Sequence, residues 1–147
     1  MPWNKIPKKE ISAWNEKLKQ NDALFSQFPY YIASEYSSLL SKAIFIKHTH
    51  EKQETAFAAI IEIGFYPFKV GVIESGPVLL QSNINTELII EDLKNYARSK
   101  GYLHLQIRPS YNASLNQVFK EDPAFDKNIY FPFHRKTEFD WNIYNKP

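Results

Sequence analysis

The sequence predicts an α/β fold of the α+β type, in which helices flank a mixed, mostly antiparallel sheet. Three apolar runs between residues 43 and 80 are separated only by short polar breaks, as in an antiparallel meander. A capped helical pattern at 85–101 then leads to an apolar run at 102–108, an order that predicts a helical crossover to a parallel strand. Two amphipathic helical patterns precede these elements and can cover the sheet.

The composition fits one soluble domain. The chain has 147 residues, and we assign residues 1–147 to a single domain. It contains no cysteine, which excludes disulfides, thiolate zinc sites and cysteine nucleophiles. The net charge is only +2 with acids and bases interspersed, so nucleic acid is not an expected partner. The N-terminus does not resemble a signal peptide and no apolar run is long enough for a membrane span, so we expect a cytoplasmic protein.

The two leading helices follow from apolar residues at helical spacing. The first is predicted at residues 9–20, where Ile11, Trp14 and Leu18 share one face. The second is predicted to begin at Pro29, because proline suits the first turn of a helix. Its expected buried face comprises Ile32, Tyr36, Leu39 and Leu40.

The predicted strands of the meander are residues 43–48, 55–65 and 68–80, and Pro67 separates the last two. The third strand is expected to stop at Gly76-Pro77, before the loop that leads to the helix. In the helix that follows, Asn85 or Thr86 is expected to cap the N-terminus. Its expected buried face comprises Ile89, Ile90, Leu93, Tyr96 and Ala97.

The last part of the chain has weaker patterns. After the strand at 102–108, the sequence predicts a short helix at 110–120 and a strand at 138–144. In that strand Phe139, Trp141 and Ile143 alternate with polar residues and would share one face.

Three short motifs stand out: Q-F-P-Y-Y-I at 27–32, S-G-P-V at 75–78 and L-Q-I-R-P at 105–109. They resemble the Gln-Ser-Pro-x-Trp, Gly-Pro-Val and Leu-Arg-Ile-Asp-Pro patterns of FemAB-type transferases, with Tyr31 at the aromatic position. These aminoacyl transferases build peptidoglycan cross-bridges, and their domains have the GNAT acyltransferase fold. The order of predicted elements is also that of a GNAT-like domain.

The resemblance implies an N-terminal half domain of a protein that carries two such domains in tandem. It implies transfer of an acyl or aminoacyl group to an amine of a cell-envelope precursor. The expected partner is a second GNAT-like domain or a homo-dimer partner, and acyl-CoA or aminoacyl-tRNA would be the donor only with that second domain. The alternative, from another functional class, is a non-catalytic binding or interaction module with a degenerate GNAT fold.

Two departures from the family patterns bear on the site. Gln106 and Arg108 stand where the FemAB-type pattern has Arg and Asp. The loop Q-S-N-I-N-T at 81–86 has no glycine, whereas ordinary GNAT enzymes hold the CoA pyrophosphate on a glycine-rich loop before the central helix. A loop without glycine cannot easily bring its backbone to phosphate oxygens. We therefore expect no cofactor to bind to this domain alone.

Glu74 is the candidate catalytic residue, because an acid on the central strands of a GNAT fold can act as a general base toward an amine. Glu62 is the other acid so placed, and both carboxylates are also compatible with simple exposed side chains. The Gly-Pro pair can shape a substrate loop, although turn chemistry alone also explains it. The candidate substrate-binding residues are Gly76, Pro77, Tyr31 and Arg108.

Other polar groups favour simpler interpretations. His48 and His50 are two residues apart, as a metal pair can be, but only Glu51 is close to them in the sequence, and no metal site is predicted. The run at 134–136, His-Arg-Lys, can form a basic cluster with Arg108, but short charged runs are more often exposed surface.

Overall fold

The computed structural model describes residues 1–21, 23–36, 38–65, 67–81, 83–108 and 129–132. Within them the sheet has the strand order β1-β2-β3-β4-β6-β7, and β5 pairs with β3. Only the β4–β6 pairing is parallel. The strands are β1 (Trp3–Lys5), β2 (Ser41–His50), β3 (Gln53–Phe65), β4 (Phe68–Glu74), β5 (Val78–Leu79), β6 (Tyr102–Arg108) and β7 (Ile129–Pro132). The helices are α1 (Ile11–Gln20), α2 (Pro29–Glu35) and α3 (Thr86–Ser99), with 3-10 turns η1 (Lys8–Glu10) and η2 (Phe25–Gln27).

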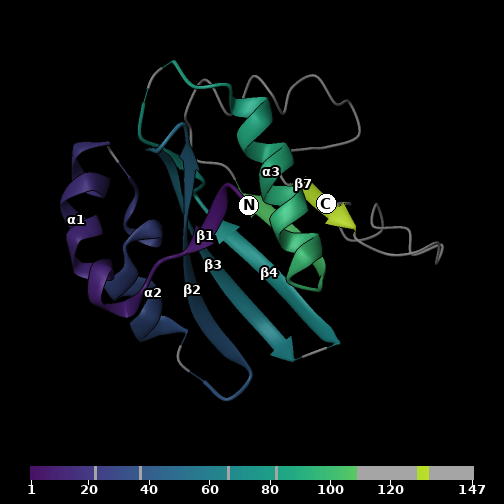
Figure 1. Ribbon diagram of the computed structural model, residues 1–147. Helices are drawn as coiled ribbons and strands as arrows, with labels where there is room; N and C mark the ends of the chain where they lie inside the picture. Colours follow the sequence, from purple (N-terminus) through teal and green to yellow (C-terminus); the bar gives the residue numbers. More distant parts are fainter. Residues whose placement is uncertain (22, 37, 66, 82, 109–128, 133–147) are drawn as a thin grey trace.

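The elements form three layers, with α1 and α2 on one face of the sheet and α3 on the other (Figure 1). Strand β3 supplies both cores because its side chains alternate between the faces. Ala58 and Ile60 belong to the apolar cluster that includes Ile89 and Leu93 of α3. Phe57 belongs to the cluster formed with α1 and α2. Burial on both faces explains why β3 is almost continuously apolar, and the predicted mixed, mostly antiparallel α+β fold is confirmed.

Strand β1 was not predicted. Its three residues are too few to show a period, yet they pair antiparallel with β2, Trp3 opposite His48. The Trp3 side chain is 1% exposed, and its indole Nε1 donates a hydrogen bond of 3.1 Å to the carbonyl oxygen of Ile89. This contact links the N-terminus to α3. A buried tryptophan with its N–H satisfied is the expected arrangement for such a side chain.

The helices largely match the prediction. Trp14 and Leu18 of α1 are buried, and Trp14 stacks on Phe57 with ring centroids 5.2 Å apart. Pro29 is the first residue of α2, as predicted, but the helix ends at Glu35. The expectation that Leu39 and Leu40 lie on its buried face is wrong, because they follow the helix and are 100% and 58% exposed.

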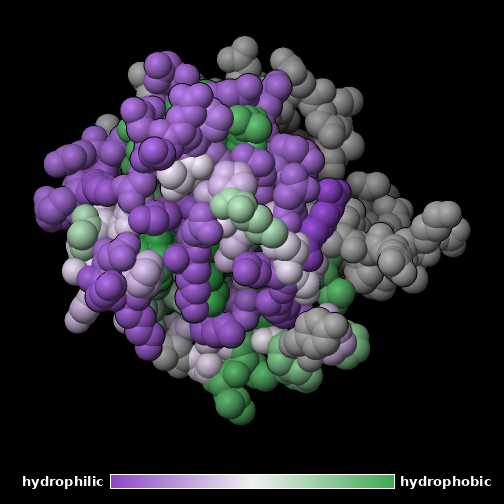
Figure 2. All heavy atoms as spheres, in the orientation of Figure 1, coloured by the Kyte–Doolittle hydropathy of each residue, from purple (hydrophilic) through white to green (hydrophobic). Residues whose placement is uncertain are grey.

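These leucines contribute to an exposed apolar end of the molecule. Figure 2 shows a mostly polar face with apolar side chains gathered at its lower end, where the β3–β4 hairpin lies. The hairpin is joined there to the segment before β2 by a hydrogen bond of 2.8 Å from the Gly64 amide to the Leu40 carbonyl. The exposed apolar residues of the two segments are Leu39, Leu40, Ile63, Phe65 and Phe68.

The predicted third strand, given as 68–80 with a stop at Gly76-Pro77, is two strands. The stop at the Gly-Pro pair is confirmed, but the inclusion of residues 78–80 in the same strand is wrong. Strand β4 ends at Glu74, the chain turns at residues 75–77, and β5 returns to pair with the earlier part of β3. The apolar run is continuous in sequence because both strands are part of the same core, so periodicity could not show the break.

Helix α3 and the crossover are confirmed. Asn85 is the cap, with its side-chain oxygen accepting a hydrogen bond of 3.1 Å from the Leu88 amide. Gly101 follows the helix with φ near +70°, a conformation that favours glycine. The predicted buried residues Ile89, Ile90, Leu93, Tyr96 and Ala97 are all buried. The predicted helix at 110–120 and strand at 138–144 lie outside the described residues.

Glu62 is a buried carboxylate on β3, contrary to its interpretation as an exposed side chain. It accepts a hydrogen bond of 2.7 Å from the Tyr102 hydroxyl and pairs with Lys42 at 2.9 Å and Lys69 at 3.4 Å. Burial alone would raise the pKa of Glu62, but Lys42, Tyr102 and Lys69 outweigh it and lower that pKa below its usual 4.5. The pKa of Tyr102 is raised by its own burial and by the Glu62 charge.

We predict that Glu62→Gln lowers the free energy of unfolding at pH 7 by about 1–3 kcal/mol, since two lysines lose their buried anion. The folded pKa of Glu62 is depressed, so its contribution is present above pH 4.5 and is lost as the pH falls through the folded pKa. Urea unfolding of both proteins from pH 7 to pH 3 should therefore show the difference shrinking in acid. Glu16→Gln, in an exposed pair with Lys19, serves as a control. A difference that persists unchanged at pH 3 contradicts this account.

Candidate functional site

The carboxyl end of β4 brings two predicted site residues together. Glu74 is the last residue of β4, and Arg108 is its partner at the end of the parallel strand β6. The Arg108 guanidinium donates a hydrogen bond to the Glu74 carboxylate, and it lies 3.3 Å from the Gln106 side-chain oxygen. The acid that pairs with Arg108 thus comes from the neighbouring strand. Both side chains remain partly accessible, at 28% for Glu74 and 48% for Arg108.

The sheet opens beside this pair. Strands β3 and β4 are paired from Phe65 and Phe68 to Ile61 and Val72. On the same side of β3, pairing resumes at Phe57, where β5 takes the place of β4. Residues 58–60 of β3 therefore face a gap that β4 leaves as it approaches Glu74. Backbone groups in such a gap need other hydrogen-bond partners, because an unpaired buried amide costs free energy.

The side chain of Gln27 fills this gap. Its oxygen accepts a hydrogen bond of 3.0 Å from the Ala59 amide, and its Nε2 donates to the carbonyl of Glu74. Gln27 is fully buried at the end of η2. One primary amide carries both a donor and an acceptor, so it can replace the missing strand pairing on both sides. The Gln27 amide therefore ties β3 to the end of β4.

The turn after Glu74 is built against the same amide. The bond between Gly76 and Pro77 is cis, and both residues are buried. A Cβ atom at Gly76 would lie 2.7 Å from the Gln27 side-chain oxygen, which is closer than Cβ atoms normally approach an oxygen. A larger residue at position 76 would therefore have to displace the Gln27 amide from its hydrogen bonds. The pair Gly76-Pro77 is thus part of the corner that holds Glu74.

Tyr31 is placed on α2, one turn after the segment that carries Gln27. It is 41% exposed, and its ring packs edge-on against Phe25 with centroids 4.9 Å apart. Among the contacts of the described residues, none joins Tyr31 to Glu74 or Arg108. The structure therefore brings Glu74, Gly76, Pro77 and Arg108 together in one corner. Tyr31 is close to this corner only in that it follows Gln27 by four residues in the sequence.

Sequence reasoning missed Gln27 as a site residue. The signal was present, since Gln27 opens the Q-F-P-Y-Y-I motif, but a glutamine before a proline-started helix gives no local reason for burial. Its partners are 32 and 47 residues away, and only the tertiary fold brings them together.

The N-terminus of α3 is occupied by its own cap. The Asn85 oxygen takes the Leu88 amide, one of the donors that a phosphate would otherwise use. A hollow of about 350 Å³ borders this loop and the start of β3, with His48, Asn83 and Asn85 among its lining residues.

The His48 imidazole is buried, and both of its ring nitrogens lie within hydrogen-bond distance of a side chain. It is 1% exposed, its Nδ1 lies 2.5 Å from the Thr55 hydroxyl, and its Nε2 lies 3.0 Å from the Asp92 carboxylate. His50 is exposed and has Glu51 at 3.9 Å. Within the described residues no group of three or more His, Cys, Asp or Glu side chains is arranged to hold a metal ion. The basic run at 134–136 lies outside the described residues.

Comparison with solved structures identifies related folds. FemX superposes with a TM-score of 0.57 at 14% identity, covering 82% of this chain and 31% of FemX. An N-acetyltransferase from Staphylococcus aureus Mu50 gives 0.50 at 21% identity, over 81% of this chain and 77% of that one. The ribosomal-protein-S18-alanine N-acetyltransferase from Escherichia coli gives 0.56 at 10% identity, over 95% and 97%. No family model and no curated protein matches the sequence.

The chain therefore shares its fold with FemX and with these two N-acetyltransferases, and this is the fold that the sequence resemblance implied. Identities this low establish the fold alone. The chain spans less than a third of FemX, whereas it spans nearly all of the alanine N-acetyltransferase.

We predict that Gln27→Ala lowers the free energy of unfolding by about 2–4 kcal/mol, because the Ala59 amide and the Glu74 carbonyl both lose a buried partner. Gly76→Ala should cost about 1–3 kcal/mol through the clash with Gln27. In the double variant, alanine at position 27 leaves room for the methyl group at position 76. The loss of unfolding free energy in the double variant should therefore be about 1 kcal/mol smaller than the sum of the losses in the two single variants.

Urea unfolding of the four proteins measures this coupling, with the exposed Gln20→Ala as a control near zero. Strict additivity of Gln27→Ala and Gly76→Ala would show that the two side chains do not oppose each other.

Proposed function

We propose that this chain is the domain of a FemAB-like acyl- or aminoacyltransferase that acts on an amine of a cell-envelope precursor. The observation that carries the proposal is the corner at the end of β4, where Gln27 holds Glu74 beside Arg108. It lies at the carboxyl end of the parallel pair β4 and β6, in a fold shared with FemX and with two N-acetyltransferases. Ligands of open α/β sheets commonly bind at such strand ends.

In this proposal Glu74 is the general base toward the acceptor amine. Arg108 binds an anionic group of the acceptor, since the Glu74 contact uses one of its five N–H donors. Gly76 and Pro77 shape the wall of the site, and Tyr31 is assigned to the acceptor side on the family resemblance. The pairing with Arg108 fixes the direction of the Glu74 carboxylate, which is the geometric requirement for proton abstraction.

The donor side is proposed to need another domain. A glycine-free loop at 81–86 and the capped N-terminus of α3 both disfavour a CoA pyrophosphate at the usual GNAT position. A second GNAT-like domain, or a homo-dimer partner, would complete the donor site for acyl-CoA or aminoacyl-tRNA. The proposed location is the cytoplasm, and no helix among the described residues is long and apolar enough to cross a membrane.

Calorimetric titration of the isolated chain with acetyl-CoA tests the donor assignment. We predict no tight stoichiometric binding, because the amide cradle for the pyrophosphate is missing. The S18-alanine N-acetyltransferase of similar length provides a positive control for the same titration. Stoichiometric binding at micromolar concentrations would instead make this chain a self-sufficient acetyltransferase.

A transfer assay tests the catalytic assignment. With the proposed partner domain and its donor present, we predict that Glu74→Gln lowers the rate of transfer to an amine-bearing envelope precursor by about 10²-fold or more, the usual range for loss of a general base. Glu87→Gln, at an exposed position on α3, is the matched control. The rate of Glu74→Gln should rise as the acceptor amine is deprotonated at higher pH. Equal rates for Glu74→Gln and the native chain would remove Glu74 from the chemistry.

The second candidate is a non-catalytic binding module. The ion pair between Glu74 and Arg108 favours it, because a carboxylate bound to a guanidinium can have a purely structural role. This function predicts that the precursor binds to the chain and that no donor, with or without a partner domain, supports turnover.

A further inference from the structure

Another hollow of the described structure lies away from the β4 corner. It is a groove of about 960 Å³ between the N-terminal segment, α1, α2 and the start of β2. None of Glu74, Gly76, Pro77, Tyr31 and Arg108 is among its lining residues. Its volume is within the usual range for sites that hold a small molecule. The groove is therefore a separate candidate for ligand binding.

The groove combines an apolar wall with one sign of charge. Ile6, Pro29 and Phe45 are buried side chains that form part of the wall. The charged residues that line it are Lys5, Lys8 and Lys42, and among the described residues no aspartate or glutamate lines it. Cations without neighbouring acids raise the local concentration of anions.

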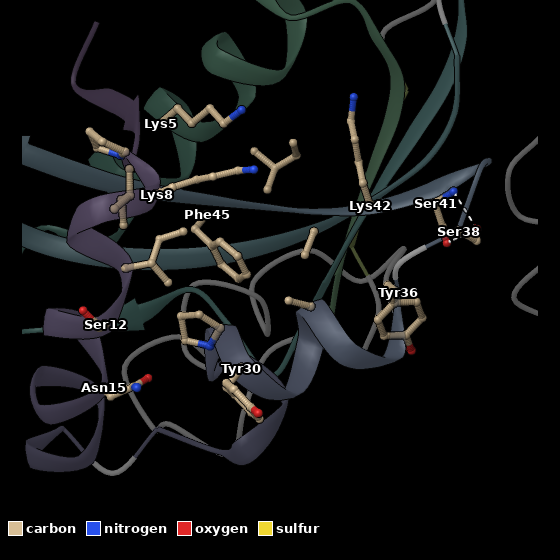
Figure 3. A pocket seen from close by; sticks show the side chains of 17 residues that line it. Lys5, Lys8, Ser12, Asn15, Tyr30, Tyr36, Ser38, Ser41, Lys42 and Phe45 are labelled. Carbon is tan, nitrogen blue, oxygen red and sulfur yellow. Dashed lines mark hydrogen bonds between the residues drawn. The ribbon is translucent and has the colours of Figure 1, made fainter.

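Two of the lysines are available to a ligand. Lys42 pairs with Glu62 at 2.9 Å, so much of its charge is already compensated. For Lys5 and Lys8, no ion pair is present within the described part of the chain. Figure 3 shows their side chains extending in the same direction from the N-terminal segment, with Phe45 below them and Tyr30 and Tyr36 on the α2 side.

Burial of a lysine charge is costly without a counter-ion, so exposed ammonium groups at the edge of an apolar wall favour a ligand with both characters. A purely apolar ligand would leave the ammonium groups without a counter-charge, and a small inorganic anion would leave the wall uncovered. A carboxylate attached to an apolar body satisfies both.

We propose that this groove binds a small amphipathic carboxylate, with its anionic group at Lys5 and Lys8 and its apolar body against Ile6, Pro29 and Phe45. The inference goes beyond the proposed function and does not rest on it, because the site shares no residue with the β4 corner. It would hold whether the chain is a transferase or a binding module.

The probe is 4-phenylbutyrate, compared with 4-phenylbutylamine and 4-phenylbutanol, which have the same apolar body with a positive charge or none. Backbone amide chemical shifts of the full chain are followed by NMR during each titration. We expect 4-phenylbutyrate to change the amide chemical shifts of groove residues such as Ile11, Ala33 and Ala43. Its dissociation constant should be at least tenfold lower than that of the amine or the alcohol. Equal binding of the three probes would overturn the proposal, and so would inorganic phosphate binding as tightly as 4-phenylbutyrate.

Matched variants distinguish a specific effect of Lys5 and Lys8 on the affinity from a general effect of positive surface charge. The double variant Lys5→Gln, Lys8→Gln should weaken 4-phenylbutyrate at least tenfold, because two charge-assisted contacts are lost. Lys9→Gln removes the same charge from the same 3-10 turn at a residue that does not line the groove, and it should leave the affinity within about twofold. Ala43→Trp, which fills the groove and leaves the lysines in place, should also abolish binding. Unchanged affinity in the double lysine variant contradicts the proposal, and circular dichroism checks that each variant is folded.

Discussion

One buried side-chain amide determines how the sheet of this domain can open. Strand β4 leaves β3 before Glu74, and the Gln27 amide satisfies the Ala59 amide on one side of the gap and the Glu74 carbonyl on the other. Without it, two buried backbone groups would lack partners, at a cost of about 1–3 kcal/mol each. A Cβ atom at position 76 would meet the same amide, so a larger residue there would have to displace it. The position of Glu74 beside Arg108 therefore depends on a residue far from both in sequence.

The domain thus has two regions of different chemical character. At the β4 corner, a carboxylate and a guanidinium are held on adjacent parallel strands, and in the proposed function they face the amine and an anionic group of the acceptor. In the groove beside α1 and α2, Lys5 and Lys8, which form no ion pair within the described residues, border an apolar wall. At the N-terminus of α3, the Asn85 side-chain oxygen accepts the hydrogen bond of the Leu88 amide. In the proposed function this cap is one reason for placing the ligand at the strand ends and not at the helix.

The fold was predictable from the sequence to the extent that local patterns report it. The cap at Asn85, the buried face of α3 and the strand at β6 follow from period and capping residues alone, and all were confirmed. The stop at Gly76-Pro77 was predictable from the Gly-Pro pair, but the return of Val78 and Leu79 to the earlier part of β3 was not, because β4 and β5 are both apolar and only their pairing with β3 distinguishes them. The end of α2 was misjudged because Leu39 and Leu40 continue the helical spacing although they are exposed.

Motifs and strand positions selected Glu74, Gly76, Pro77 and Arg108, and the structure places these four in one corner, whereas Tyr31 packs against Phe25. A role of any of them in binding or catalysis stays a prediction, and the construction of the corner was not predictable. The buried state of Glu62 was missed, because its partners Lys42 and Lys69 come from neighbouring strands whose register cannot be derived from composition. Gln27 was missed for the same reason, since its role depends on contacts across 32 and 47 residues.

The most direct test of the central claim is hydrogen exchange at a single backbone amide, that of Ala59. On the side of β3 that faces β4, the pairing with β4 ends at Ile61, so in the described structure the Ala59 amide donates to the Gln27 side-chain oxygen instead. If the Gln27 amide closes the gap, the Ala59 amide exchanges as slowly as neighbouring core amides of β3 in the native chain. Exchange of Ala59 at the rate of exposed loop amides, with the rest of β3 protected, would contradict the account.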